Sequence, residues 1–157
     1  MLTKECFTSL AQRHMDTIFR FAYSCLKSRA DADDVTQNVL LALYKTDREF
    51  ENDRHLKNWL LRVTANECKK HWRSPWRKTA DLDGLAEDAV WEEPQYSDLF
   101  QAIMALDRKY RVVILLYYIE GYSIAETGQL LGLPQGTVGT RLRRAREKLK
   151  HYLTEEE

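Results

Sequence analysis

Five polar side chains in the stretch 135–144 have the chemistry to bind duplex DNA. Amides and hydroxyls can hydrogen-bond base edges in the major groove, and arginines can hold phosphates or read guanine. In a helix these residues lie outside the apolar face formed by Val138, Leu142, Ala145, Leu149 and Leu153. The stretch therefore predicts a DNA-binding helix. Its candidate contact residues are Gln135, Thr137, Thr140, Arg141 and Arg144.

The residues just before this helix have the turn chemistry of a helix-turn-helix. Ser123 and Glu126 have the spacing of a capping box, which begins a helix. Gly132 can adopt the positive φ that ends that helix, and Pro134 can open the next, because its missing N–H would be unpaired there. Gly128 lets the two helices approach closely. This order predicts a helix-turn-helix whose second helix enters a DNA groove.

A second candidate nucleic-acid site lies at 69–78, which holds five lysines and arginines, two tryptophans and no acid. Cations interleaved with aromatic rings suit single strands, and a base stacked on a ring contributes about 1–3 kcal/mol. We expect Trp72, on an apolar stripe, to be core and Trp76 to be available for stacking. Asn66 carries an amide that can read an unstacked base.

Acidic residues on a third segment point to a protein partner. Asp33 and Asp34 precede Gln37 and Asn38 by one helical turn. Because carboxylates repel phosphate, we expect this face to bind protein and not DNA. The alternative is that the aspartates only stabilise the start of their helix, for which Asp31 is the predicted cap.

The elements that position these residues are predicted to be helices throughout. No glycine or proline occurs before Pro75, and helical apolar spacing runs through 7–26, 35–44 and 56–72. Two apolar stripes on the third segment, which includes Trp59 as a core residue, indicate a wide buried face or a bend near Asn66. Residues 79–97 contain acids, Gly84 and Pro94 but no basic residue, which predicts a linker. Further helices are predicted at about 98–106, 108–119, 123–131 and 135–153.

The chain is thus predicted to be all-α, with two small helical domains at 1–78 and 98–157 joined by the acidic linker 79–97. Its 157 residues carry zero net charge, but the three segments 1–78, 79–107 and 108–157 have net charges of +5, −8 and +3. The two basic segments could bind a polyanion that the acidic middle segment does not contact. The alternative is that this charge distribution is a chance clustering of solvated side chains.

Composition and the N-terminus favour a cytoplasmic protein. The chain is 44% hydrophobic and 31% charged, as in a soluble globular protein, and contains no run of eighteen apolar residues and no secretory signal pattern. We therefore expect no membrane insertion. Cys6, Cys25 and Cys68 are an odd number without a CxxC pair, which predicts reduced, buried thiols.

Taken in order, these features resemble the extracytoplasmic-function (ECF) subfamily of bacterial RNA polymerase sigma factors. Residues 32–39 (ADDVTQNV) are similar to its polymerase clamp-binding helix, residues 59–66 (WLLRVTAN) to its Trp-Leu, Arg-Ile-Ala, Asn run, and residues 136–146 (GTVGTRLRRAR) to its recognition helix. The resemblance spans nearly the whole chain. It departs from the family pattern at Asn38, where an acid is usual, and at Gly139, where a lysine is usual, so a phosphate contact is lost at 139.

The resemblance implies that sigma domain two, residues 1–78, binds core polymerase and opens the minus-10 element, while sigma domain four, residues 98–157, reads the minus-35 element. It implies no catalysis and no cofactor, and an anti-sigma protein is a candidate further partner. The expected polymerase-binding residues are Asp33, Asp34, Gln37 and Asn38. The expected minus-10 residues are Asn66, Lys69, Lys70, Arg73, Trp76 and Arg77. The expected minus-35 residues are Gln135, Thr137, Thr140, Arg141 and Arg144.

Three other functions have less support from the sequence. A regulator that uses only the helix-turn-helix would bind a duplex operator unaided, whereas a sigma factor needs core polymerase. Cys68 and His71, three residues apart, form only half of a zinc site. A carboxylate-metal nuclease would have to use Asp31, Asp33 and Asp34. The sequence contains no Gly-rich phosphate loop or nucleophile motif, so an enzyme is the weaker hypothesis.

Overall fold

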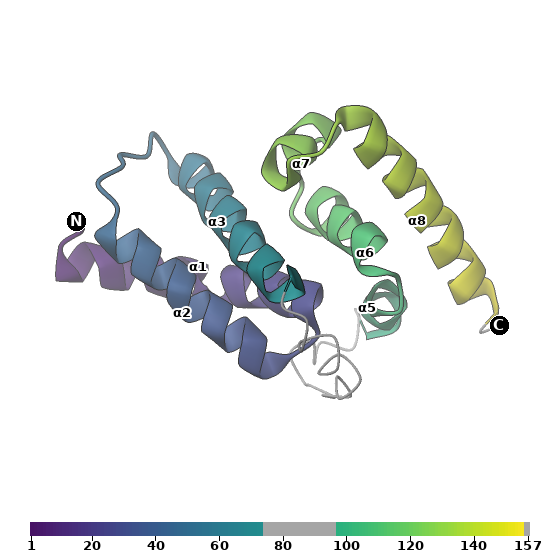
Figure 1. The fold of residues 1–157 in the computed structure, drawn as a ribbon, viewed down its shortest axis with the longest axis horizontal. Coiled ribbons are helices and arrows are strands. Elements are labelled where there is room, and N and C mark those ends of the chain that lie inside the picture. Colours follow the sequence, from purple (N-terminus) through teal and green to yellow (C-terminus); the bar gives the residue numbers. More distant parts are fainter. Residues whose placement is uncertain (74–96, 156–157) are drawn as a thin grey trace. The chain divides into compact units, whose positions relative to one another are not determined.

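A computed structural model describes residues 1–73 and 97–155, and all regular structure in these residues is helical. The all-α prediction is confirmed. The chain divides into two compact units, Met1–Glu87 and Asp88–Glu157, each treated separately below. The predicted linker 79–97 lies outside the described residues, apart from Ser97, which begins a helix (Figure 1).

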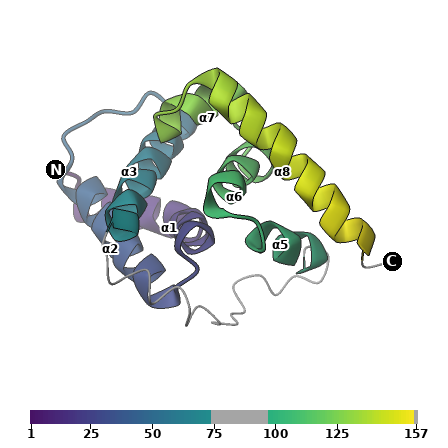
Figure 2. The same ribbon diagram turned by 45° about the vertical axis from the view of Figure 1, so that its right-hand side comes forward.

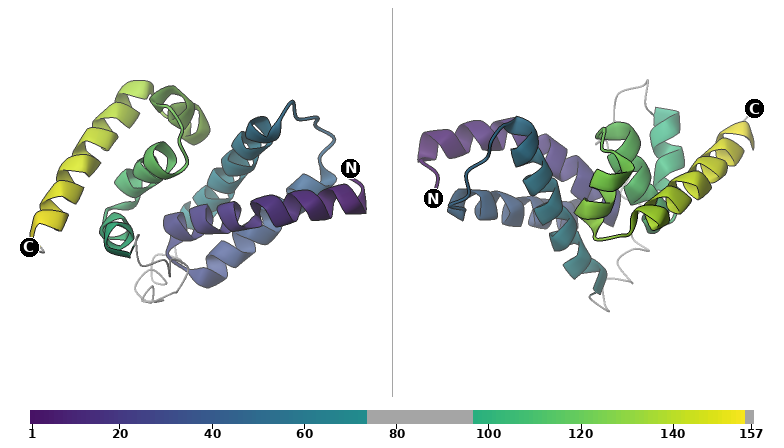
Figure 3. Two further views of the ribbon diagram at one scale, coloured as in Figure 1. Left: turned by 180° about the vertical axis from the view of Figure 1, so that it is seen from behind. Right: turned by 90° about the horizontal axis from the view of Figure 1, so that it is seen from above.

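Two long helices that lie side by side start the first unit (Figures 1 and 3). α1 (Lys4–Leu26) ends at Lys27, whose φ of 54° turns the chain back. α2 (Arg29–Lys45) begins directly afterwards, with the Ser28 Oγ accepting the Asp31 N–H at 3.2 Å. The prediction that Asp31 caps this helix is therefore wrong. The tight reversal leaves Ser28 in the extended conformation that an N-cap requires, and Asp31 falls in the first turn.

The third helix of this unit, α3 (Asp53–Arg73), packs against both α1 and α2. It runs without a break past Asn66, which is exposed. Side chains of both predicted apolar stripes are buried, as the wide-face alternative requires. The residues of α3 that are buried in the core are Leu56, Leu60, Leu61, Thr64, Ala65 and Cys68.

Three residues of this unit differ from their predicted burial. Cys25 and Cys68 are buried, but Cys6 is exposed in the first turn of α1, so the prediction of a buried thiol is wrong there. Trp59 is only partly buried, with its ring 5.4 Å from that of Phe50. Trp72 is also partly buried, and its Nε1–H donates to the Cys25 carbonyl at 3.4 Å. An indole at the core edge keeps its polar N–H paired in this way.

The second unit contains α5 (Ser97–Met104), α6 (Arg108–Ile114), the π-helical turn η4 (Leu115–Ile119), α7 (Ile124–Leu131) and α8 (Gln135–Glu155). The long α8 packs against the three shorter α-helices, as Figure 2 shows for α6 and α7. The largest side chains that are fully buried in its core are Ile103, Val113, Ile114, Leu116, Val138 and Leu142.

The predicted single helix over 108–119 changes type before its end. From Leu115 the chain widens into a π-helical turn, closed by the Glu120 N–H donating to the Leu115 carbonyl at 3.0 Å. Gly121, with φ of 78°, then directs the chain toward α7. Such five-residue turns are not visible in an apolar pattern, because they change the hydrogen bonding and not the residue types.

Candidate nucleic-acid interface

The helix-turn-helix is built by the local contacts that its sequence predicts. The Glu126 N–H donates to Ser123 Oγ and the Ser123 N–H to Glu126 Oε1, both at 3.0 Å, which confirms the capping box. Gly132 ends α7 with φ of 71°, as predicted. A Cβ on Gly128 would lie 2.7 Å from the Leu133 carbonyl oxygen, so only glycine fits this close approach. The turn between α7 and α8 is thereby fixed.

The predicted DNA-contacting residues occupy the first three turns of α8. Gln135 and Arg144 are exposed, whereas Thr137, Thr140 and Arg141 are partly buried. On the opposite side, the predicted inward residues Val138, Leu142 and Ala145 are buried, while Leu149 and Leu153 are only partly buried. The structure therefore separates the apolar face of α8 from the side chains expected to contact DNA.

A cavity of about 340 Å³ lies beside the recognition helix. Four of the five predicted side chains, all but Gln135, line it together with Gly136. Its other wall is formed by Lys109 and Tyr110 of α6. In residues 1–73 and 97–155, no carboxylate forms an ion pair with Arg141 or Arg144. Lys109 was not predicted, because no local pattern connects it with residues almost thirty positions later.

The acidic face of α2 lies open in the first unit. Asp33, Asp34, Gln37 and Asn38 are all exposed. The Asp34 carboxylate lies 3.4 Å from His71 Nε2, and Asn38 Nδ2 donates to Glu67 Oε1 at 3.2 Å. Ser28 caps the helix and Asp31 is the acidic residue of its first turn, so Asp33 and Asp34 do not fill the alternative role at the helix start.

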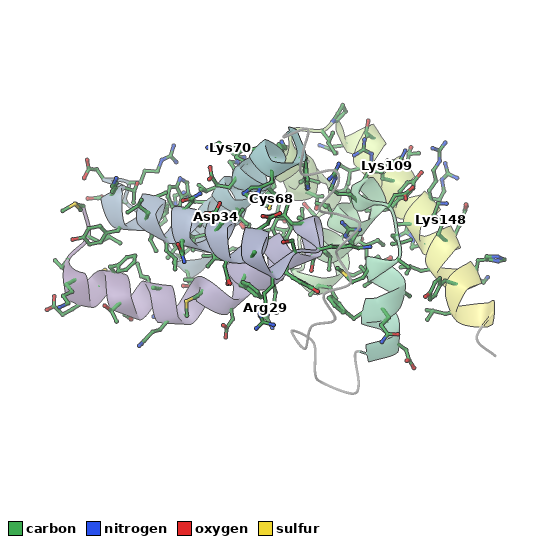
Figure 4. The ribbon with its side chains drawn as sticks, turned by 60° about the horizontal axis from the view of Figure 1, so that its bottom comes forward. Arg29, Asp34, Cys68, Lys70, Lys109 and Lys148 are labelled. Carbon is green, nitrogen blue, oxygen red and sulfur yellow. The ribbon has the colours of Figure 1, made fainter. Side chains whose placement is uncertain are left out.

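The basic end of α3 adjoins this acidic face. Asn66 and Lys70 are exposed and Lys69 is partly buried. Lys70 Nζ lies 2.6 Å from Glu67 Oε2, so the Glu67 carboxylate is shared by Lys70 and Asn38. Residues predicted for polymerase and for DNA thus meet on one surface, where Figure 4 labels Asp34 and Lys70. The Arg73 side chain, Trp76 and Arg77 lie outside the description of the structure.

Other titratable clusters of the first unit serve structure. Asp53 Oδ1 accepts from Arg13 Nη1 at 3.0 Å and lies 3.1 Å from His14 Nε2. The hydrogen bond from Arg13 is the main reason that the pKa of Asp53 lies below its usual value. In the described part of the chain, no group of three or more His, Cys, Asp and Glu side chains could hold a metal ion.

Comparison with known proteins agrees with this geometry. Sigma-70 region 2 matches residues 10–78, and Sigma-70, region 4 matches residues 96–149. The ECF RNA polymerase sigma factor SigM of Mycobacterium tuberculosis is 30% identical, over 94% of this chain and 76% of that protein. This chain belongs to the ECF sigma factor family. The ECF sigma factor SigW of Bacillus subtilis is 29% identical to this sigma factor, over 96% of this chain and 90% of SigW.

Two solved structures share the fold of this sigma factor. RpoE of Bartonella quintana, crystallised with the anti-sigma factor NepR, is 26% identical with a TM-score of 0.74, over 96% of this chain and 98% of that one. CnrH, solved with the cytosolic domain of CnrY, is 28% identical with a TM-score of 0.67, over 99% and 92%.

The predicted family and function are confirmed. The protein is a sigma factor that directs transcription initiation by RNA polymerase. Its partners are accordingly core polymerase and promoter DNA. None of the helices in 1–73 and 97–155 has the length and apolar character needed to cross a membrane.

Proposed function

We propose that the sigma factor divides promoter recognition between its two units. Residues 1–78 bind core polymerase and open the minus-10 element, residues 98–157 bind the minus-35 element, and residues 79–97 connect them. The protein contributes binding and no catalysis of its own, and it works in the cytoplasm with the polymerase. The matches of Sigma-70 region 2 to residues 10–78 and of Sigma-70, region 4 to residues 96–149 support this division.

The polymerase-binding face consists of Asp33, Asp34, Gln37 and Asn38 on α2. Their exposure leaves them open to a partner, and the carboxylates of Asp33 and Asp34 would repel DNA phosphates. Gln37 offers an uncharged donor and acceptor beside them. A basic or amide-rich protein surface is the partner that this combination suits.

The minus-10 surface consists of Asn66, Lys69, Lys70, Arg73, Trp76 and Arg77. Asn66 is exposed on α3, one helical turn before Lys69 and Lys70, so its amide can reach a base while the lysines hold phosphates. Lys70 is already paired with Glu67, and a phosphate would compete with that carboxylate. Asn66 therefore supplies sequence choice here and the lysines supply affinity.

The minus-35 surface consists of Gln135, Thr137, Thr140, Arg141 and Arg144. The observation that carries this role concerns Arg141 and Arg144, which lie in the second helix of the helix-turn-helix. Neither has a carboxylate partner among the residues that the structure describes. An arginine without a counterion is available for a phosphate or for guanine.

The test is run-off transcription with core polymerase, with core binding measured separately. We expect the double variant Asp34→Lys, Gln37→Ala to lose core binding, because it replaces an acidic contact by a repulsive one. Arg144→Ala should bind core normally and retain minus-35 DNA more weakly, by about 1–3 kcal/mol if the contact is bidentate. Asp16→Lys, a charge reversal at an exposed residue of α1, is the matched control for the double variant.

Two outcomes would contradict the proposal. Core binding at full strength in the double variant would remove α2 from the polymerase interface. Specific binding of a duplex operator by the chain alone, as tight as that of the holoenzyme, would instead support an autonomous regulator.

An anti-sigma protein is a further proposed partner. RpoE of Bartonella quintana was crystallised with the anti-sigma factor NepR, and CnrH was solved in complex with the cytosolic domain of CnrY. Their folds match this chain along nearly its whole length, so the same kind of regulation suits this sigma factor.

A further inference from the structure

The cavity beside the recognition helix has a second wall that the minus-35 surface does not use. This wall consists of Lys109 and Tyr110 of α6, which face Thr137, Thr140, Arg141 and Arg144 of α8. We propose that the cavity binds a backbone phosphate of the minus-35 duplex, with Lys109 as a cation supplied from outside the helix-turn-helix. The inference rests on the proposed role of α8 in DNA binding and extends the interface to α6.

The charges around the cavity support a polyanion as its ligand. Lys109 Nζ lies 5.1 Å and Lys148 Nζ 5.6 Å from the centre of the Tyr110 ring, so two lysines from different helices meet at one side chain (Figure 4). Within 1–73 and 97–155, no carboxylate forms an ion pair with either lysine or with Arg141 and Arg144. Like charges gathered without a counterion repel one another, and a bound phosphate would relieve that repulsion.

Packing alone explains the stem of Lys109 but not its charge. Tyr110 is only 6% exposed, and the aliphatic part of a lysine can cover such a ring. The ammonium group, however, sits in the first turn of α6, where the helix dipole disfavours a cation. Its contact with the Tyr110 ring offsets part of that penalty, and the exposed ammonium group remains able to bind an anion.

Uncharged donors complete the cavity. Thr137 and Thr140 bring hydroxyls that can donate to phosphate oxygens. Gly136 is exposed, and a Cβ added there would meet nothing within 4 Å, so a DNA strand can approach the backbone at this point. Cations on both walls with hydroxyls between them recognise a phosphate and carry no sequence information. Duplex DNA held by α8 brings such a phosphate to the cavity.

The test measures binding of a promoter duplex by holoenzyme made with the full chain, as a function of salt concentration. Lys109→Met keeps an aliphatic stem over Tyr110 and removes the charge. We expect its log–log salt slope to be smaller by about 0.9, which corresponds to a loss of affinity of about eightfold at 0.1 M salt relative to 1 M. The loss should be equal for all minus-35 sequences, because a phosphate contact is blind to the base.

Two variants serve as controls. Lys109→Arg keeps the charge and should restore the wild-type affinity and slope. Arg108→Met removes the same charge one residue earlier on α6, from a side chain that does not line the cavity, and should leave the slope unchanged.

Several outcomes would overturn the inference. It fails if Lys109→Met has the salt slope of wild type or of Arg108→Met, or if its loss depends on the minus-35 sequence. If Arg144→Ala still weakens binding in that case, only the cavity assignment is wrong. If Arg144→Ala is also without effect, the minus-35 role of α8 fails with it.

Discussion

Replacing Gly128 by alanine should destabilise the second unit, although alanine is the better helix former. Gly128 lies inside α7, where glycine costs about 1 kcal/mol relative to alanine. An added Cβ would stand 2.7 Å from the Leu133 carbonyl oxygen, below the 3.0 Å that real Cβ contacts respect. That carbonyl belongs to the turn of the helix-turn-helix and is backbone, so it cannot swing aside like a side chain.

The size of the effect follows from two opposing contributions. Relieving the contact must move the Leu133 carbonyl, and the N–H of the same residue is held by the Gly128 carbonyl at 2.9 Å. Overpacking that shifts backbone costs about 1–3 kcal/mol, and the cost here lies toward the upper end because the contacted atom is backbone. After subtraction of the helix gain of about 1 kcal/mol, the net loss is about 1–2 kcal/mol. For a domain of this size that lowers the melting temperature by roughly 4–8 °C per kcal/mol.

Gly139→Ala is the matched control, because Gly139 lies in α8 and an added Cβ would meet nothing within 4 Å. It should stabilise the unit by about 1 kcal/mol. Amide hydrogen exchange of the full chain, followed over residues 108–150, measures both effects locally even if the two units unfold separately. If amide hydrogen exchange in Gly128→Ala is as slow as in wild type, or slower, the contact with the Leu133 carbonyl does not destabilise the unit and the prediction is wrong.

Two further predictions concern the first unit. The hydrogen bond from Arg13 lowers the pKa of Asp53 in the folded protein below its unfolded value of 3.8. The ionised carboxylate therefore stabilises the fold fully above pH 3.8. This stabilisation is lost as the pH falls through the lower pKa of the folded state. Asp53→Asn should lower the free energy of unfolding by at most about 1 kcal/mol at pH 7, and by less at pH 3. An equal loss at the two pH values would contradict the stabilising role of the ionised carboxylate. Asn66→Ala should change which minus-10 sequences open, measured by permanganate reactivity of promoter thymines in holoenzyme; unchanged opening and unchanged preference would make Asn66 a structural residue.

Features set by neighbouring residues could be predicted from the sequence. The capping box at Ser123 and the positive φ at Gly132 depend on contacts within a few residues, and both are confirmed. The apolar face of α8 follows from helical periodicity, which is equally local. The same reasoning failed at Asp31, because Ser28 and Asp31 are both good caps and the reversal at Lys27 decides between them.

Contacts between distant segments could not be predicted in this way. Lys109 reaches the recognition helix only because α6 packs against α8, and nothing near Lys109 in the sequence indicates that packing. The π-helical turn at Leu115 was not predicted either, because it changes the hydrogen bonding and not the spacing of apolar residues. Residue types therefore predicted the chemistry of the candidate surfaces, whereas the packing of the helices determines which residues belong to each surface.

Asn38 shows how such packing explains a departure from the family pattern. An acid is usual at this position in the family that the chain resembles, but here Asn38 Nδ2 donates to Glu67 Oε1 at 3.2 Å. A carboxylate at position 38 would bring two like charges to that distance, and their repulsion would be relieved only by moving Glu67 away. Glu67 is held in place by Lys70, 2.6 Å from its other oxygen. The amide at 38 and the acid at 67 are therefore complementary, and the change at 38 fits the neighbouring surface of α3.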